Sequence, residues 1–488
     1  MNTIASSVLP ASVELPQYDR QQLRSRIVHF GFGAFHRAHQ ALLTHRVLNQ
    51  HGGDWGICEI SLFSGDVLMS QLRQQNHLFT VMEKSAAGNQ PIIVGAVNEC
   101  LNAKLDTLAA IIEKFCEPQV AIVSLTITEK GYCIDPATGH LDATQPRIVH
   151  DLQSPSEPHS APGILVEALH RRRERGLAAF TVLSCDNIPN NGHVVKNAVL
   201  DMATRRSPEL AQWIAEHVSF PGTMVDRIVP AATDASLAEI TRELGVEDPC
   251  AISCEPFIQW VIEDNFVAGR PDWGSAGAQL VDDVLPWEEM KLRMLNGSHS
   301  FLAYLGYLAG YAHISDCMQD ESYRRAARHL TMTEQAPALG STGVDLNAYA
   351  DSLVERFSNP ALQHRTWQIA MDGSQKLPQR LLDGIRIHLR EGSRWPLLAL
   401  GVAAWMRYVS GVDDAGNTID IRDPLAEKIH ALVANSNNDT RVERLLTLQE
   451  IFGNDLPANP QFVNAVSQAW QHLVQQGARQ ALLTALND

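Results

Sequence analysis

The feature that most constrains the fold is a strand pattern that runs directly into a glycine turn and a helical pattern. Residues 26–30 form a short apolar strand, the motif Gly31-Phe32-Gly33-Ala34-Phe35-His36 follows, and residues 42–47 show helical spacing. Glycine lets the backbone approach an anion, and the N–H groups at a helix start face it, so this element is typical of phosphate binding. His36 holds the place of the third glycine of G-x-G-x-x-G, which leaves the match to a dinucleotide fingerprint incomplete.

A second strand is predicted over residues 56–63, with Asp66 just beyond it. An acid near the end of this strand binds the ribose hydroxyls of NAD and repels the 2′-phosphate of NADP. The spacing from the glycines is longer than in the common motif, and a helix N-cap is the alternative explanation for Asp66.

Strands and helices continue to alternate. Apolar runs at 91–97, 119–125 and 180–184 are separated by helical patterns at 105–115 and 163–175. This alternation predicts an α/β fold with a doubly wound parallel sheet of Rossmann type, in which ligands bind at the carboxyl ends of the strands. Thr126 and Asn187 follow two of these strands and are candidates for a cofactor contact and an amide donor, although plain turns explain them equally well.

Strand patterns end near Pro286. Helical patterns follow at 287–311, 320–334, 344–357, 378–390, 395–409, 421–434, 439–451 and 459–486. We therefore expect an NAD-binding Rossmann-like domain over residues 1–285 and a mainly α-helical substrate and catalytic domain over residues 286–488.

The helix that opens the second domain carries Lys291, Asn296 and His299. On an α-helix, Lys291 and His299 lie about 80° apart, with Asn296 about 60° beyond His299, so all three can face one cleft. A partly buried lysine is a suitable general base for an alcohol proton, an amide N–H stabilises the resulting oxyanion, and a histidine binds a neighbouring hydroxyl. The ordinary alternative is a surface lysine, a capping asparagine and a core histidine.

Composition excludes several classes of function. The 39 basic and 55 acidic residues give a net charge of −16, which argues against nucleic acid or an anionic membrane as partner. We find no apolar run of the length that spans a bilayer and no signal-peptide pattern. The eight cysteines are scattered, and Cys250 and Cys254 have no second ligand pair, so we expect reduced thiols, no metal site and a cytoplasmic protein.

These motifs together resemble the mannitol dehydrogenase family of polyol-specific long-chain dehydrogenases, which includes fructuronate reductase, also called mannonate oxidoreductase. The resemblance covers nearly the whole chain and rests on five motifs in order: residues 31–39, 126–132, 184–187, 218–230 and the set Lys291, Asn296 and His299.

The resemblance implies a metal-independent oxidoreductase that uses NAD. Lys291 would be the general base, Asn187 and Asn296 the oxyanion donors, Asp226 a carboxylate that influences the lysine, and His299 a substrate-binding residue. The cofactor would lie on Gly31, Phe32, Gly33, Ala34, Phe35 and Thr126, with Asp66 near the adenosine ribose.

Residues 365–380 look closest to the fructuronate reductase branch. A sugar-acid substrate needs a cation for its carboxylate, and Lys376 and Arg380 are the candidates, with Arg37 a weaker one. We expect the interconversion of D-mannonate and D-fructuronate by a monomer or weak homo-oligomer. The alternatives are a polyol dehydrogenase acting on mannitol or arabinitol, and a non-catalytic regulator that binds NAD(H).

Overall fold

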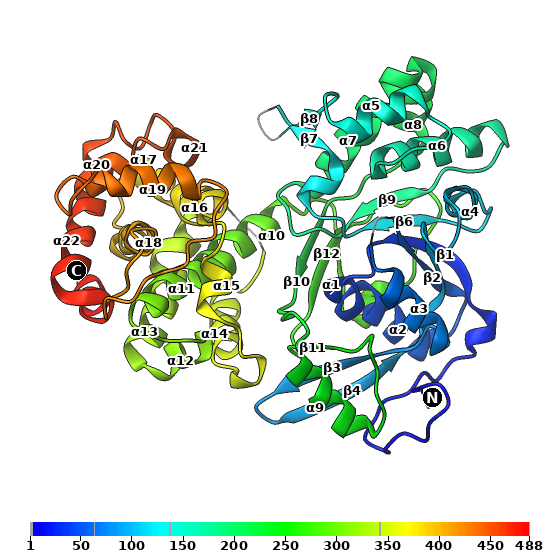
Figure 1. Ribbon diagram of the computed structural model, residues 1–488, viewed down its shortest axis with the longest axis horizontal. Coiled ribbons are helices and arrows are strands. Elements are labelled where there is room, and N and C mark those ends of the chain that lie inside the picture. The colour runs from blue at the N-terminus through cyan, green and yellow to red at the C-terminus, as the bar shows by residue number, and fades with distance from the viewer. Residues whose placement is uncertain (1–2, 63, 136–137, 341–342, 488) are drawn as a thin grey trace. The chain divides into compact units, whose positions relative to one another are not determined.

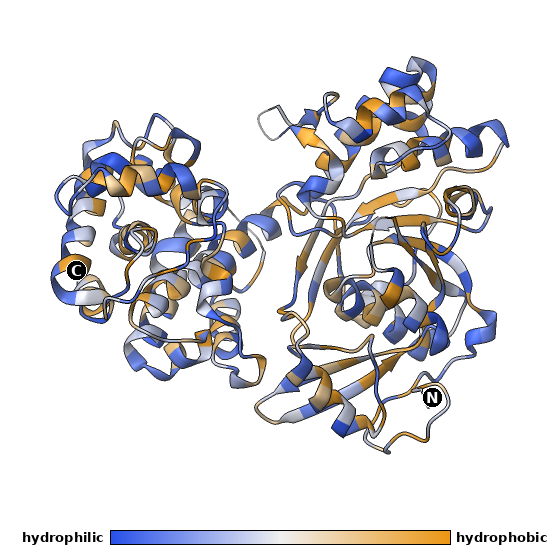
Figure 2. Cartoon of the chain, viewed as in Figure 1, coloured by the Kyte–Doolittle hydropathy of each residue, from blue (hydrophilic) through white to orange (hydrophobic). Residues whose placement is uncertain are grey.

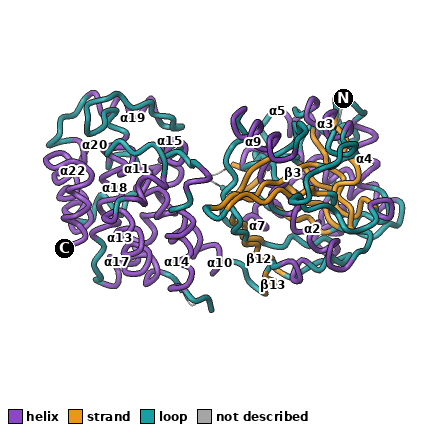
Figure 3. Tube along the Cα trace, turned by 90° about the horizontal axis from the view of Figure 1, so that it is seen from below, coloured by secondary structure: helices purple, strands orange, loops and turns teal. Residues whose placement is uncertain are grey.

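A computed structural model describes residues 3–62, 64–135, 138–340 and 343–487 of the chain. The expected end of the second strand, Phe63, lies outside these residues. The chain divides into two compact units, Met1–Leu285 and Pro286–Asp488. Strands occur in the first unit, whereas the second is built from helices (Figure 1, Figure 3).

The first unit is organised around a parallel sheet of five strands in the order β5-β2-β1-β6-β9. The bounds are β1 Arg24–Phe30, β2 Trp55–Ser61, β5 Val97–Asn102, β6 Ile122–Leu125 and β9 Thr181–Ser184. The chain moves outward from β1 to β2 and β5 on one side, then crosses to β6 and β9 on the other. This order confirms the expected doubly wound sheet and places its reversal point between β1 and β6.

Both faces of the sheet are buried, and neighbouring positions on a strand contribute to different cores. Ile27, Ile57 and Ile122 enter one core, whereas their successors Val28, Cys58 and Val123 enter the other. Such two-sided burial explains why the strands read as continuous apolar runs rather than as alternating ones. Figure 2 shows the same strands as largely hydrophobic.

The first unit also contains helices, most of which connect or cover these strands. They are α1 Ala34–Ala38, α2 Gln40–His51, α3 Asp66–Gln74, α4 Leu108–Phe115, α5 Pro146–Gln153, α6 Ala161–Glu174, α7 Asn191–Arg206, α8 Pro208–His217 and α9 Asp234–Leu244. The basic run at residues 171–175 lies at the end of α6, where Arg172 is buried and donates to the carbonyls of Phe115 and Glu117.

Further strands form smaller sheets. One contains β3 Phe79–Ser85, β4 Gly88–Val94 and β11 Ile252–Cys254; another contains β10 Thr223–Asp226, β12 Gln259–Glu263 and β13 Gln279–Val281; the last pairs β7 Ile134–Asp135 with β8 His140–Leu141. The expected single strand at 91–97 is therefore wrong. It divides at Gly95, whose position against Pro16 and Arg20 leaves no room for a side chain, and its two parts join different sheets.

The second unit packs its helices around α11 and α18, which are buried on nearly every side. Its helices are α10 Leu285–Met290, α11 Ser298–Leu308, α12 Ile314–Gln319, α13 Glu321–His329, α14 Leu346–Phe357, α15 Thr366–Ala370, α16 Gly373–Leu377, α17 Asp383–Glu391, α18 Pro396–Tyr408, α19 Ala426–Ala434, α20 Arg441–Leu445, α21 Gln449–Phe452 and α22 Pro460–Asn487. No helix in the described part of the chain is long and apolar enough to cross a membrane.

The helix expected over 287–311 is not uniform. Between α10 and α11 the backbone takes a π-helical turn over Lys291–Gly297. A π-turn places successive side chains at angles that differ from those of an α-helix. The α-helical projection of Lys291 and Asn296 is therefore wrong in detail, although both side chains and His299 still belong to one continuous helical segment.

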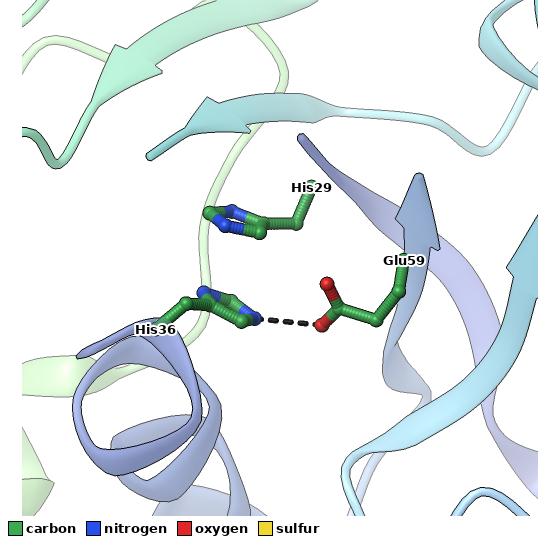
Figure 4. A group of neighbouring side chains, drawn as sticks. All are labelled: His29, His36 and Glu59. Carbon is green, nitrogen blue, oxygen red and sulfur yellow. Dashed lines mark hydrogen bonds and ion pairs between the residues drawn. The ribbon is translucent and has the colours of Figure 1, made fainter. Parts of the chain in front are cut away.

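Three fully buried polar side chains meet between the central sheet and α1. They are His29 on β1, His36 on α1 and Glu59 on β2. The ring nitrogens and the carboxylate oxygen that could bind a metal ion all lie within 4.8 Å of one another (Figure 4). His36 Nε2 lies 2.7 Å from Glu59 Oε1. Burial raises the pKa of Glu59 to about 7 and lowers that of His36 to about 3, because the charged form of each loses its hydration.

The geometry of this group does not fit a single metal ion. The two imidazole rings stack face to face, with centroids 3.4 Å apart and planes 11° from parallel. A ring nitrogen binds a metal in the plane of its ring, so lone pairs of stacked rings do not converge on one ion. His29 is also engaged elsewhere: its Nδ1 lies 2.7 Å from Ser124 Oγ, and its Nε2 lies 2.9 Å from Thr126 Oγ1.

We therefore predict that chelation leaves the protein intact. Dialysis against EDTA should leave the melting temperature unchanged, and elemental analysis of the purified protein should show no stoichiometric zinc, because the group is a hydrogen-bonded core. About one equivalent of zinc, lost together with a lower melting temperature, would contradict this assignment. The His36→Ala variant is the control, since it should lower the melting temperature with or without EDTA.

Candidate functional site

One cavity of the first unit lies at the reversal point of the sheet. It has a volume of about 310 Å³ and is lined by residues at or just beyond the ends of β1, β2 and β6, including Gly31, Ser61, Thr126 and Thr128. Parallel sheets bind ligands at this point because adjacent connections leave in opposite directions and open a crevice. Lys130 and Arg147 also line the cavity and contribute positive charge, which fits an anionic ligand such as a dinucleotide.

Gly31 is required by the close approach of two backbones. Its φ is +105°, and a Cβ atom there would lie 2.4 Å from the carbonyl oxygen of Thr126. Gly33 N–H donates to Gly31 O over 2.7 Å, which closes the turn. Gly31, the first glycine of the motif, thus makes the tight turn that is typical of a dinucleotide-binding loop, and Thr126 lies directly opposite it.

The side chains of Phe32, Phe35 and His36 in this motif pack against other residues of the first unit. His36 occupies the third glycine's place and extends to Glu59 on β2 instead of allowing closer helix packing. Phe32 is buried against Phe79, with ring centroids 5.5 Å apart, and Phe35 stacks on His39 at 4.8 Å. Ala34 begins α1, which is 5 residues long.

Arg37 is not available as a carboxylate partner. It is buried, with its guanidinium bonded to the carbonyl oxygens of Gly33 and Cys250. Arg37, the weaker candidate for binding a substrate carboxylate, thus donates its hydrogen bonds to backbone carbonyls.

Asp66 lies at the start of α3 rather than at the end of a strand, because β2 ends at Ser61. Its carboxylate pairs with Lys104 at 2.9 Å, and hydrogen bonding by Lys104 lowers its pKa. Gly65, not Asp66, is the N-cap of this helix.

Two further candidates lie at strand ends in the first unit. Asn187 is exposed and follows β9, next to the buried Asp186. Asp226 is the buried last residue of β10. Its neighbour Arg227 pairs with Glu83 and donates to the carbonyl of Glu255 over 2.9 Å.

The second unit contains its own group of buried polar side chains. Lys291, Asn296 and His299 are only 5%, 8% and 6% exposed. Within the described residues, Asn296 Oδ1 and His299 Nε2 are buried without a hydrogen-bond partner. Buried polar atoms are nearly always satisfied, so two unsatisfied atoms on neighbouring turns indicate a place where a polar ligand binds.

The two basic candidates, Lys376 and Arg380, are half-buried and lie next to this group. Arg380 Nη1 lies 3.0 Å from Ser300 Oγ and 3.4 Å from Asn296 O, and its Nε has no partner among the described residues. Lys376 Nζ donates to Ile369 O and Met371 O. Burial and, to a smaller extent, the charge of Arg380 lower the pKa of Lys376 to about 8, and burial lowers the pKa of Arg380 to about 10.

The sequence did not reveal His364. Its ring meets that of His299 edge-on at 4.8 Å, while Phe357 stacks on His299 from another side at 5.0 Å. Burial, followed by the charge of Lys376, lowers the pKa of His364 to about 4, so it is neutral near pH 7. Nothing in the spacing of residues 357–364 indicated a contact with a residue about sixty positions away.

Comparisons with known proteins agree along the whole chain. Residues 25–275 match the mannitol dehydrogenase Rossmann domain and residues 283–474 match the mannitol dehydrogenase C-terminal domain. The uncharacterized oxidoreductase YeiQ of Escherichia coli (strain K12) is 77% identical, with 100% of both chains covered. The D-mannonate oxidoreductase of the same organism is 58% identical, with 99% of both chains covered.

Solved structures agree with this relationship. The mannitol 2-dehydrogenase of Pseudomonas fluorescens, in a ternary complex with NAD and D-mannitol, is 41% identical and has a TM-score of 0.87 over 98% of both chains. A D-sorbitol dehydrogenase in substrate-free form is 33% identical, with a TM-score of 0.89 over 97% of this chain and 98% of the other. The chain therefore belongs to the mannitol dehydrogenase family of oxidoreductases, which act on secondary alcohols.

Proposed function

We propose that the protein is an NAD-dependent dehydrogenase of a sugar acid, with D-mannonate and D-fructuronate as the substrate pair. The observation that carries the proposal is the half-buried pair Lys376 and Arg380 beside the unsatisfied atoms of Asn296 and His299. A substrate carboxylate would supply the counter-charge for these two cations, and the substrate hydroxyls would satisfy the neutral atoms.

The relatives support the same choice. Identity is 58% to the D-mannonate oxidoreductase of E. coli, against 38% to a mannitol 2-dehydrogenase of Pyricularia oryzae. The cofactor is proposed as NAD on the basis of the crevice at Gly31 and Thr126, the positively charged lining, and the NAD in the complex of the Pseudomonas enzyme. In this proposal Asp66 lies near the adenosine ribose and Gly31 to Phe35 line the cofactor.

The chemistry assigned to the side chains requires no Lewis acid. When bound, NAD accepts the hydride from the carbinol carbon. Lys291 in its unprotonated form takes the hydroxyl proton, and the amide N–H groups of Asn187 and Asn296 donate to the developing oxyanion. Asp226 influences the proton on the lysine, and His299 binds a neighbouring hydroxyl. A neutral His299 suits this role, and burial lowers its pKa well below its usual value.

Replacement of the base tests this scheme. Lys291→Ala should lower kcat at least about a hundredfold, since a general base contributes roughly that factor or more, while the Kd for NADH stays within about twofold. Steady-state kinetics and a fluorescence titration with NADH measure the two quantities. Substantial activity of this variant at neutral pH would remove Lys291 as the base, and wild-type activity would favour a regulator that only binds NAD(H).

The carboxylate partner gives a second prediction, with a defined dependence on pH. The Lys376 ammonium is present below its pKa of about 8 and is lost as the pH rises through that value. The KM for D-mannonate should therefore rise above pH 8. Lys376→Met should raise it about tenfold at pH 7, as expected when a charge-assisted hydrogen bond is lost, whereas the inhibition constant of the neutral polyol D-mannitol stays within about twofold.

Lys428→Met is the matched control for this experiment. Lys428 is an exposed lysine of the same unit that pairs with Glu450, so its loss should change neither constant. An unchanged KM for D-mannonate in Lys376→Met, together with turnover of neutral polyols, would instead favour a polyol dehydrogenase.

A further inference from the structure

The turn that follows β6 is held in a strained conformation. Thr128 has a φ of 63° and a ψ of 166°. This region of backbone conformation is essentially restricted to glycine, and a side chain there persists only when surrounding contacts impose it. Thr126, Ile127, Thr128, Lys130 and Gly131 all line the cavity at the reversal point, so the strain is located at the candidate cofactor crevice.

The contacts that impose this conformation come from one buried carboxylate. Asp186, in the loop after β9, is 7% exposed. Its Oδ2 accepts the N–H of Ile127 at 3.0 Å, and its Oδ1 accepts the N–H of Thr128 at 2.9 Å. The hydroxyl of Tyr132, at the far end of the same turn, donates to Oδ2 over 2.6 Å. Three donors from residues 127–132 thus converge on a single side chain.

The same residue organises the loop that carries Asn187. Asn191 Nδ2 donates to the carbonyl oxygen of Asp186 over 3.1 Å and to Thr223 O over 2.9 Å. Asp186 therefore joins the turn after β6 to the loop after β9, both at the carboxyl edge of the sheet.

We propose that Asp186 is a positioning residue that holds the strained turn at residues 126–131 in the conformation that binds the dinucleotide. Its carboxylate satisfies the two N–H groups beside Thr128 and so offsets the unfavourable φ of that residue. The inference rests on the proposed use of NAD, because the ligand of the crevice is taken to be that cofactor.

The experiment compares NADH dissociation constants of the full-length protein by fluorescence titration. Asp186→Asn keeps the shape but places an amide N–H₂ group against a backbone N–H, so binding should weaken about tenfold, as expected when charge-assisted hydrogen bonds are lost. In Thr128→Gly, glycine adopts the positive φ without strain, so the turn no longer requires the hydrogen bonds of Asp186. The double variant Asp186→Asn with Thr128→Gly should therefore bind within about threefold of wild type.

Asp248→Asn is the matched control. Asp248 is also a buried carboxylate of the first unit, and it accepts the N–H groups of Thr80 and Cys250 together with Gln75 Nε2. None of these residues lines the crevice. Its substitution should lower the melting temperature while the Kd for NADH stays within about twofold. Tyr132→Phe removes one of the three hydrogen bonds to Asp186, so the Kd for NADH should rise about threefold. This variant provides the test if Asp186→Asn does not fold.

The outcomes separate the two proposals. Wild-type affinity in Asp186→Asn, or a loss that Thr128→Gly does not reverse, overturns the positioning role while NAD remains the cofactor. Failure of the wild-type protein itself to bind NADH overturns the proposed cofactor and the inference with it.

Discussion

The first unit depends on the close approach of two backbones at the centre of its sheet. β1 and β6 are neighbours, and the residues that leave them, Gly31 and Thr126, come so near that a Cβ on Gly31 would lie 2.4 Å from the Thr126 carbonyl. The reversal of strand order opens the crevice, and glycine allows the chain to turn there without closing it. The stacked rings of His29 and His36 lie between the sheet and α1. The carboxylate of Asp186 accepts hydrogen bonds from the turn that follows Thr126. Polar groups thus fix the shape of this edge, while the apolar faces of the strands fix the sheet.

The second unit holds two half-buried cations, Lys376 and Arg380, next to Asn296 and His299. Lys376 and Arg380 are held by carbonyl and hydroxyl oxygens, and burial lowers the pKa of both. Asp372 and Asp423 raise the pKa of Lys376 in part, but burial and the charge of Arg380 outweigh them. The hydrogen bonds that orient Lys376 and Arg380 come from carbonyl and hydroxyl oxygens, which suits the proposed binding of a sugar acid.

Much of this architecture was predictable because it follows from local patterns. Apolar runs, a glycine turn and polar residues at strand ends indicated the parallel sheet, and the loss of strand signals after Pro286 indicated the helical unit. The motifs that resemble the mannitol dehydrogenase family indicated Lys291, Asn296 and His299, which lie buried in one helical segment. Their assigned roles remain proposals.

Contacts between distant residues were not predictable in the same way. The π-turn at Lys291–Gly297 was not predicted, because the apolar spacing of residues 287–311 indicated a single helix. Residues 151–160 are polar and rich in proline, a composition typical of surface loops, yet Asp151 is fully buried and accepts the N–H groups of His159 and Ser160. The local sequence around Arg172 and Asp186 likewise did not indicate that both side chains are buried. In each case the partners of a polar side chain decide its burial, and they are far away in sequence or depend on the exact path of a loop.

The measurement that tests the central claim most directly is NADH formation by the purified protein with D-mannonate, beside D-mannitol, D-arabinitol and related aldonates, at neutral and mildly alkaline pH. The account predicts turnover confined to aldonates, with an affinity that declines above pH 8 as Lys376 loses its proton. Turnover of the neutral polyols alone, with D-mannonate inert at every pH, would contradict it.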